Sequence, residues 1–90
     1  MTVGVLIVED DAKFRAAFAD AVESAPDMHL LGAAANGRQG IEMLDRHAPD
    51  VLLVDLGLPD VHGLEVIRHA AATRPDCDVM VVTVFGDEKH

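Results

Sequence analysis

Aromatic residues are scarce in this chain of 90 residues, which contains no Trp, no Tyr and three Phe. Any hydrophobic core must therefore be aliphatic, built from Val, Leu, Ile and Ala. Because half of the residues are hydrophobic, we expect a packed core, and the composition excludes wholesale disorder. The length suits one small domain, which we expect to occupy residues 1–90.

Positive charge is also scarce, since 7 Lys and Arg stand against 16 Asp and Glu and the formal net charge is −9. A surface that binds nucleic acid needs a basic face, so we expect this segment to bind no nucleic acid. The acidic excess is compatible with metal binding and equally with an ordinary soluble surface.

Cysteine is limited to Cys77, which excludes an intramolecular disulfide and favours a reduced thiol in a cytosolic protein. The first four residues carry no positively charged side chain, and the apolar run at residues 5–8 is too short to cross a bilayer. We therefore expect no signal peptide, no membrane contact and a cytoplasmic location.

Apolar runs without alternation predict three strands buried on both faces, at residues 3–8, 51–54 and 79–84. A weaker run at residues 28–34 predicts a fourth strand nearer an edge of the sheet. Helical patterns lie between these runs, and alternation of this kind predicts a parallel sheet covered by helices.

Three helices are predicted by apolar residues at steps of three and four. The first follows an N-cap at Asp11 and stops at Pro26, the second covers residues 37–47 with Asn36 and Gln39 as a capping box, and the third covers residues 63–73. The expected inward positions are Phe14, Ala17, Phe18, Ala21, Val22 and Ala25, then Ile41, Leu44 and Ala48, then Leu64, Ile67, Ala70 and Ala71.

Acidic residues gather where the predicted strands end, which is where ligands bind in parallel α/β sheets. Counted along the chain, the first predicted strand (residues 3–8) is followed by Glu9 and Asp10, the third (51–54) ends in Asp55, and Thr83 lies late in the fourth (79–84). If the first and third strands are neighbours, the three carboxylates converge, and a hard divalent cation such as Mg²⁺ would relieve their repulsion. An Asp beside that ion can attack phosphorus.

Each of these residues alone has a simpler explanation. Asp11 is typical of a helix cap, Asp55 of a turn after a strand, and Thr83 of a β-branched strand residue. The combination at three strand ends is what favours phosphoryl chemistry. The five His residues show no metal-ligand spacing.

Four segments resemble the receiver domain of bacterial response regulators in order and spacing: VLIVEDD at residues 5–11, VDLGLPDVHG at 54–63, VVT at 81–83, and GAAANG at 32–37. The last resembles the subgroup that carries a C-terminal helix-turn-helix DNA-binding domain. The resemblance implies an α/β, flavodoxin-like, doubly wound parallel sheet with strand order 2-1-3-4, lacking the family's fifth strand and last helices. It also implies phosphorylation by a sensor histidine kinase and an output in transcription.

The resemblance also implies a role for individual residues. Asp55 is the phosphoacceptor, Asp10 a direct Mg²⁺ ligand and Glu9 a ligand through water. The other implied positions are the backbone carbonyl of Gly57 as third protein ligand, Pro59 and Gly63 as shapers of the loop, Thr83 as the switch hydroxyl, and Phe85 as the position that tunes dephosphorylation. The family's Lys on strand five has no counterpart, because Lys89 falls at the start of a predicted fourth helix.

A phosphoacceptor of this kind would not be an enzyme in its own right. Two other functions remain possible for this sequence. A phosphohydrolase with an Asp nucleophile needs a second acid two residues later, where this chain has Gly57. An interaction module would keep the fold without accepting a phosphoryl group. We also expect self-association, because residues 79–84 would form an apolar edge without Lys or Pro to discourage pairing.

Overall fold

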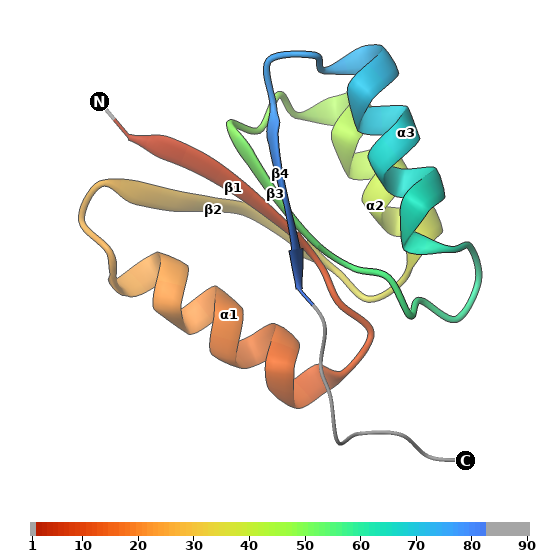
Figure 1. Ribbon diagram of the computed structural model, residues 1–90. Helices are drawn as coiled ribbons and strands as arrows, with labels where there is room; N and C mark the ends of the chain where they lie inside the picture. The colour runs from red at the N-terminus through yellow and green to blue at the C-terminus, as the bar shows by residue number, and fades with distance from the viewer. Residues whose placement is uncertain (1, 83–90) are drawn as a thin grey trace.

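The computed structural model describes residues 2–82 and shows helices alternating with the strands of one parallel sheet (Figure 1). The elements are β1 (Val3–Val8), α1 (Ala12–Ser24), β2 (Met28–Ala34), α2 (Gly37–Arg46), β3 (Val51–Asp55), α3 (Gly63–Thr73) and β4 (Asp78–Val82). The strand order is β2-β1-β3-β4. This confirms the predicted order and the edge position of residues 28–34.

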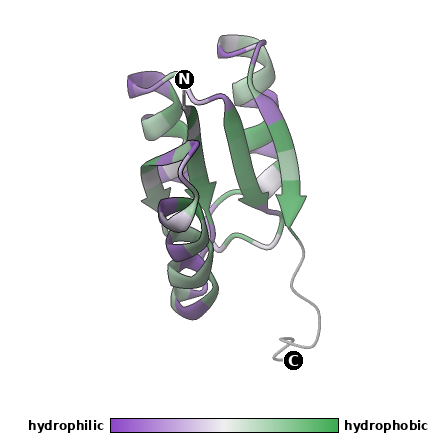
Figure 2. Ribbon diagram, turned by 90° about the vertical axis from the view of Figure 1, so that its left-hand side faces the viewer, coloured by the Kyte–Doolittle hydropathy of each residue, from purple (hydrophilic) through white to green (hydrophobic). Residues whose placement is uncertain are grey.

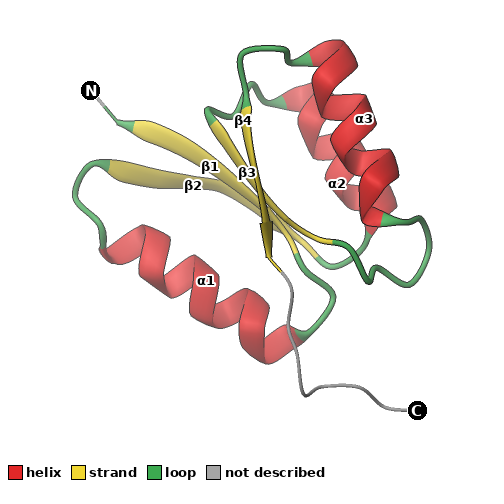
Figure 3. Ribbon diagram, in the orientation of Figure 1, coloured by secondary structure: helices red, strands yellow, loops and turns green. Residues whose placement is uncertain are grey.

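The helices form two unequal layers on the sheet, with α1 alone on one face and α2 beside α3 on the other (Figure 3). The strands are the most hydrophobic part of the chain (Figure 2). Along β1, alternate residues enter two different clusters, with Leu6 and Val8 facing α2 and α3 and with Val5 and Ile7 facing α1. A strand buried on both faces needs the unbroken apolar run seen in its sequence.

The first two helices begin where their caps were predicted. The carboxylate of Asp11 accepts the N–H groups of Lys13 and Phe14, and the Asn36 side chain accepts the N–H of Gln39. His62 is a third N-cap, because its Nδ1 accepts the N–H of Leu64 at 3.1 Å.

The buried faces of the helices were predicted less well. In α1, Val22 is buried, whereas Phe14 is 38% exposed and Ala17 and Ala21 are exposed. In α3, Val66 and Ala70 are buried and Leu64 is 46% exposed. Both helices are apolar on several sides, so spacing alone does not determine which side faces the sheet.

No helix in the described part of the chain has the length and apolar character needed to span a membrane. The strand predicted at residues 79–84 begins one residue earlier, and the expectation that it is buried on both faces is wrong, because β4 lies at the edge of the sheet and Val79, Met80 and Val81 are exposed. Its last two predicted residues lie outside the described range, as do Phe85 and the start of the predicted fourth helix.

Candidate metal centre

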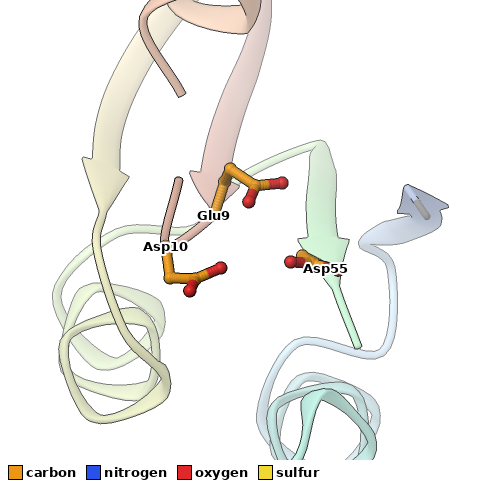
Figure 4. Close-up of side chains that lie close together, drawn as sticks. All are labelled: Glu9, Asp10 and Asp55. Atoms are coloured by element: carbon orange, nitrogen blue, oxygen red, sulfur yellow. The ribbon is translucent and has the colours of Figure 1, made fainter. Parts of the chain in front are cut away.

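Three carboxylates meet at the carboxyl ends of β1 and β3. The two strands are neighbours, and Val8 pairs with Val54, so the residues that follow them, Glu9 and Asp55, come side by side. Glu9, Asp10 and Asp55 each offer a carboxylate oxygen, and these oxygens all lie within 4.8 Å of one another. Figure 4 shows the three side chains turned toward one shared space. The predicted convergence is therefore present.

Glu9 is the buried member of the cluster, with only 2% of its surface exposed. Its Oε2 accepts the N–H of Asp11 at 3.1 Å, whereas Oε1 has no hydrogen-bond partner within residues 2–82. Burial raises the pKa of Glu9 to about 7, and the charges of Asp55 and Asp10 act in the same direction. A buried oxygen without a partner is costly, and a cation at this position would remove the cost.

Arg15 holds the loop that carries the first two acids. Its guanidinium Nη1 donates to the backbone carbonyl of Glu9 at 2.9 Å and lies 3.3 Å from that of Asp10. The sequence analysis missed this residue. The signal available was its place four residues after the N-cap, which directs a long side chain back toward the start of the helix.

The β3–α3 loop approaches Asp55 through its glycines. The N–H of Gly57 donates to Asp55 Oδ1 at 3.2 Å, and the N–H of Gly63 donates to the carbonyl of Leu56 at 3.2 Å. A Cβ on Gly63 would come within 2.6 Å of the backbone of Asp55 and Leu56, whereas one on Gly57 would meet only Asp55 Oδ1, at 3.9 Å. Gly63 therefore permits a close backbone approach, and Pro59 lies exposed between the two glycines.

The donor set fits a hard cation, because every candidate side-chain ligand in the described part of the chain is a carboxylate oxygen, and one of them is buried without a hydrogen-bond partner there. Asp11 does not join the cluster, since its side chain caps α1. Thr83 and Phe85, the two other predicted site residues, lie outside the described residues.

Comparison with known families gives one match that covers nearly the whole chain: residues 5–90 match the response regulator receiver domain. Among curated proteins, a protein-glutamate methylesterase/protein-glutamine glutaminase of Treponema pallidum is 36% identical over 86 residues, which is 96% of this chain and 21% of that protein. The nitrate/nitrite response regulator protein NarL of Escherichia coli is 36% identical over 85 residues, which is 94% of this chain and 39% of that protein.

Solved structures agree in fold. The response regulator domain of Thermotoga maritima CheB has a TM-score of 0.86 and 28% identity, and the match covers 98% of this chain and 65% of that one. The receiver domain of AraT from Geobacillus stearothermophilus has a TM-score of 0.86 and 31% identity, covering 94% of this chain and 67% of that one. The chain thus spans about two thirds of these domains and less than half of either curated relative.

Proposed function

Because the chain belongs to the response regulator receiver domain family, we propose that Asp55 accepts a phosphoryl group beside a bound Mg²⁺. The observation that carries the proposal is the buried Oε1 of Glu9, which has no hydrogen-bond partner among residues 2–82 and lies in the same cluster as Asp10 and Asp55. A structural carboxylate at this depth would be expected to have a partner.

The acidic residues and Gly57 would each have a separate role in cation binding and phosphoryl transfer. Asp10 and Asp55 would bind the cation directly, Glu9 through water, and Gly57 through its backbone carbonyl. The cation would neutralise charge on the group being transferred. A carboxylate oxygen of Asp55 attacks phosphorus, and the bond from phosphorus to a histidine nitrogen of the donor breaks, so the imidazole keeps the electron pair. The N–H of Gly57 orients the Asp55 carboxylate during this step.

The remaining assignments follow the resemblance. The donor would be a sensor histidine kinase in the cytoplasm, and the chain itself would have no separate enzyme activity. Residues 1–90 would form most of one receiver domain, with Pro59 and Gly63 shaping the loop, Thr83 as switch hydroxyl and Phe85 tuning dephosphorylation. A C-terminal DNA-binding domain is supported by the similarity to the transcriptional regulatory protein DegU and to NarL. The acidic balance of this chain indicates that this segment itself would not bind nucleic acid.

A cation titration tests the site. Saturating Mg²⁺ should raise the free energy of unfolding by roughly 1–3 kcal/mol, because the ion binds the folded state only. Asp10→Ala should lose this effect, whereas Asp20→Asn, an exposed acid outside the cluster, should keep it. A melting temperature that does not move in tens of millimolar Mg²⁺, at matched ionic strength, would contradict the proposal and favour an interaction module.

Phosphorylation tests the chemistry. In a chain that extends through the family's fifth strand, a small phosphodonor should add one phosphoryl group, and Asp55→Asn should abolish the addition. For the 90-residue chain we expect little accumulation, because the Lys of strand five would be needed to pair with the phosphoryl oxygens. Stable, stoichiometric phosphorylation of the 90 residues would show that this Lys is dispensable.

We also propose that this 90-residue chain pairs with a second copy of itself through β4. Met80 and Val81 are 57% and 46% exposed on this edge strand. Met80 also lines a hollow of about 350 Å³ whose other lining includes Phe18 and Met28. Within residues 2–82, β4 pairs with β3 alone, so a second copy could pair with its other edge and cover the apolar side chains.

A further inference from the structure

The loop between β3 and α3 is fastened to a different helix through Asp60. The N–H of Gly37 donates to Asp60 Oδ1 at 2.8 Å, and the N–H of Arg38 donates to Oδ2 at 2.9 Å. The N–H of Val61 also donates to Oδ1, at 2.8 Å. One exposed carboxylate thus joins this loop to the first turn of α2.

The first turn of α2 contains no acidic residue of its own. Asn36 accepts the N–H of Gln39 at 2.9 Å, which leaves the two preceding N–H groups for Asp60. Hydrogen bonds from backbone N–H groups, that of Arg38 foremost, lower the pKa of Asp60. The carboxylate is therefore charged at neutral pH and lies at the positive end of the helix.

Gly37 is the second feature of this contact. A Cβ at this position would collide with Val61 and would lie 3.2 Å from Asp60 Oδ1. Only a residue without a side chain allows the loop to lie so close to α2. Hydrogen bonds and close packing therefore support the same contact between α2 and the loop.

The same loop carries the proposed metal site. It begins directly after Asp55, and it contains Gly57, whose N–H donates to Asp55 Oδ1. It closes at Gly63, whose N–H donates to the carbonyl of Leu56. A short segment held at both ends and fastened at Asp60 has few conformations, and this restricts where the carbonyl of Gly57 can point.

From this arrangement we propose that Asp60 is a positioning residue, which fastens the β3–α3 loop to α2 and so holds Gly57 and Asp55 ready for the cation. The role in cation binding rests on the proposed function. The fastening of the loop is a separate property, which can be measured without any metal.

The metal-free measurement is amide hydrogen exchange at Gly63 in the 90-residue chain. In Asp60→Ala, we expect this amide to exchange several-fold faster than in the wild type, because the loop is released from α2. Asn36→Ala is the matched control, since it removes the other cap of α2 without touching the loop, and it should leave the Gly63 amide protected. Equal protection of this amide in Asp60→Ala and wild type would overturn the proposal.

The second measurement is the Mg²⁺ dissociation constant, followed through amide chemical shifts. Asp60→Ala should raise this dissociation constant at least about threefold. The rise should be smaller than the one caused by losing a group that hydrogen-bonds a metal ligand directly. Asp60→Asn, which keeps one oxygen acceptor, should give a smaller rise, and Asn36→Ala should give none. An unchanged constant in Asp60→Ala, or an equal rise in Asn36→Ala, would overturn the positioning role.

The two measurements separate the two hypotheses. If the wild-type chain binds no Mg²⁺, the proposed function fails, and the exchange rate at Gly63 still decides whether Asp60 fastens the loop. If the wild type binds Mg²⁺ and Asp60→Ala binds it equally well, the proposed function survives and the inference about Asp60 fails.

Discussion

The two faces of the sheet are covered to different extents. On the side of α2 and α3, eight buried residues form one cluster that includes Leu6, Leu44 and Leu52. On the side of α1, the buried cluster contains Val5, Ile7 and Val22, and a hollow of about 350 Å³ lies beside it. One face therefore holds most of the core, whereas the other is partly open.

The acidic cluster lies at the end of the partly open face of the sheet, the face that α1 covers. Side chains alternate along a strand, so Asp55 is in phase with Leu53, and Glu9 continues the phase of Ile7. Ile7 belongs to the cluster that faces α1, and Leu53 packs against that cluster. One face of the sheet thus holds most of the buried core, whereas the other leads to the acidic cluster, and substitutions on the two faces are expected to differ in their effects.

The largest difference is expected from truncating core side chains on the two faces. Leu44→Ala, at a fully buried position, should lower the free energy of unfolding by about 3–5 kcal/mol because it leaves a cavity. Phe18→Ala, on the open face, should cost only about 1–2 kcal/mol because Phe18 is half buried. Urea denaturation measures both, and equal costs would remove the distinction between the faces.

A second prediction concerns Gly63 at the start of α3, where the face covered by α2 and α3 meets the acidic cluster. Gly63→Ala should cost about 1–3 kcal/mol and weaken Mg²⁺ binding, because the new Cβ would press on the backbone of Asp55 and Leu56. Gly57→Ala is the control, since its Cβ has room, and it should cost less than about 0.5 kcal/mol. If both variants unfold at the same urea concentration, close packing at Gly63 is not needed.

A third test uses pH to examine the site on the open side. The pKa of Glu9 in the folded chain is raised to about 7, so the folded state holds this proton more tightly than the unfolded state. Stability should therefore fall as pH rises from about 5 to about 8, by on the order of 1 kcal/mol, because Asp10 is exposed and Asp55 half-buried, so that solvent screens the charges that act on Glu9.

Glu9→Gln should remove most of this pH dependence, and saturating Mg²⁺ should reduce it in the wild type, because the cation stabilises the ionised form. Urea denaturation at several pH values, with and without Mg²⁺, provides the measurement. A wild-type slope of the opposite sign would show that Glu9 is not the group that titrates.

The smallest effect on stability is expected for Met80→Lys on β4. Because Met80 is exposed, the change should move the free energy of unfolding by less than about 0.5 kcal/mol. It should nevertheless abolish self-association, since Lys on an edge strand discourages pairing. Light scattering at about 10 μM decides the matter: a wild-type monomer would mean that the open face and the β4 edge need no partner.

Much of this arrangement could be predicted from sequence because its causes are local. Apolar runs identified the strands, Asp11 and Asn36 marked the helix starts, and acids at two strand ends indicated the site. The buried faces of α1 and α3 could be predicted only in part, because both helices carry apolar residues on several sides: Val22 and Ala70 are buried as predicted, whereas Phe14 and Leu64 are exposed. The contact of Asp60 with Gly37 joins residues 23 positions apart, and no local pattern indicates it. The individual site roles depend on the family resemblance.

The pairing of Val8 with Val54 limits how the chain can change in length over evolution. One residue inserted within β3 would shift every later side chain of that strand to the opposite face and carry Asp55 away from Glu9. Two inserted residues would restore the side but displace the carboxylate along the strand. Insertions inside β1 and β3 are therefore expected to be strongly selected against.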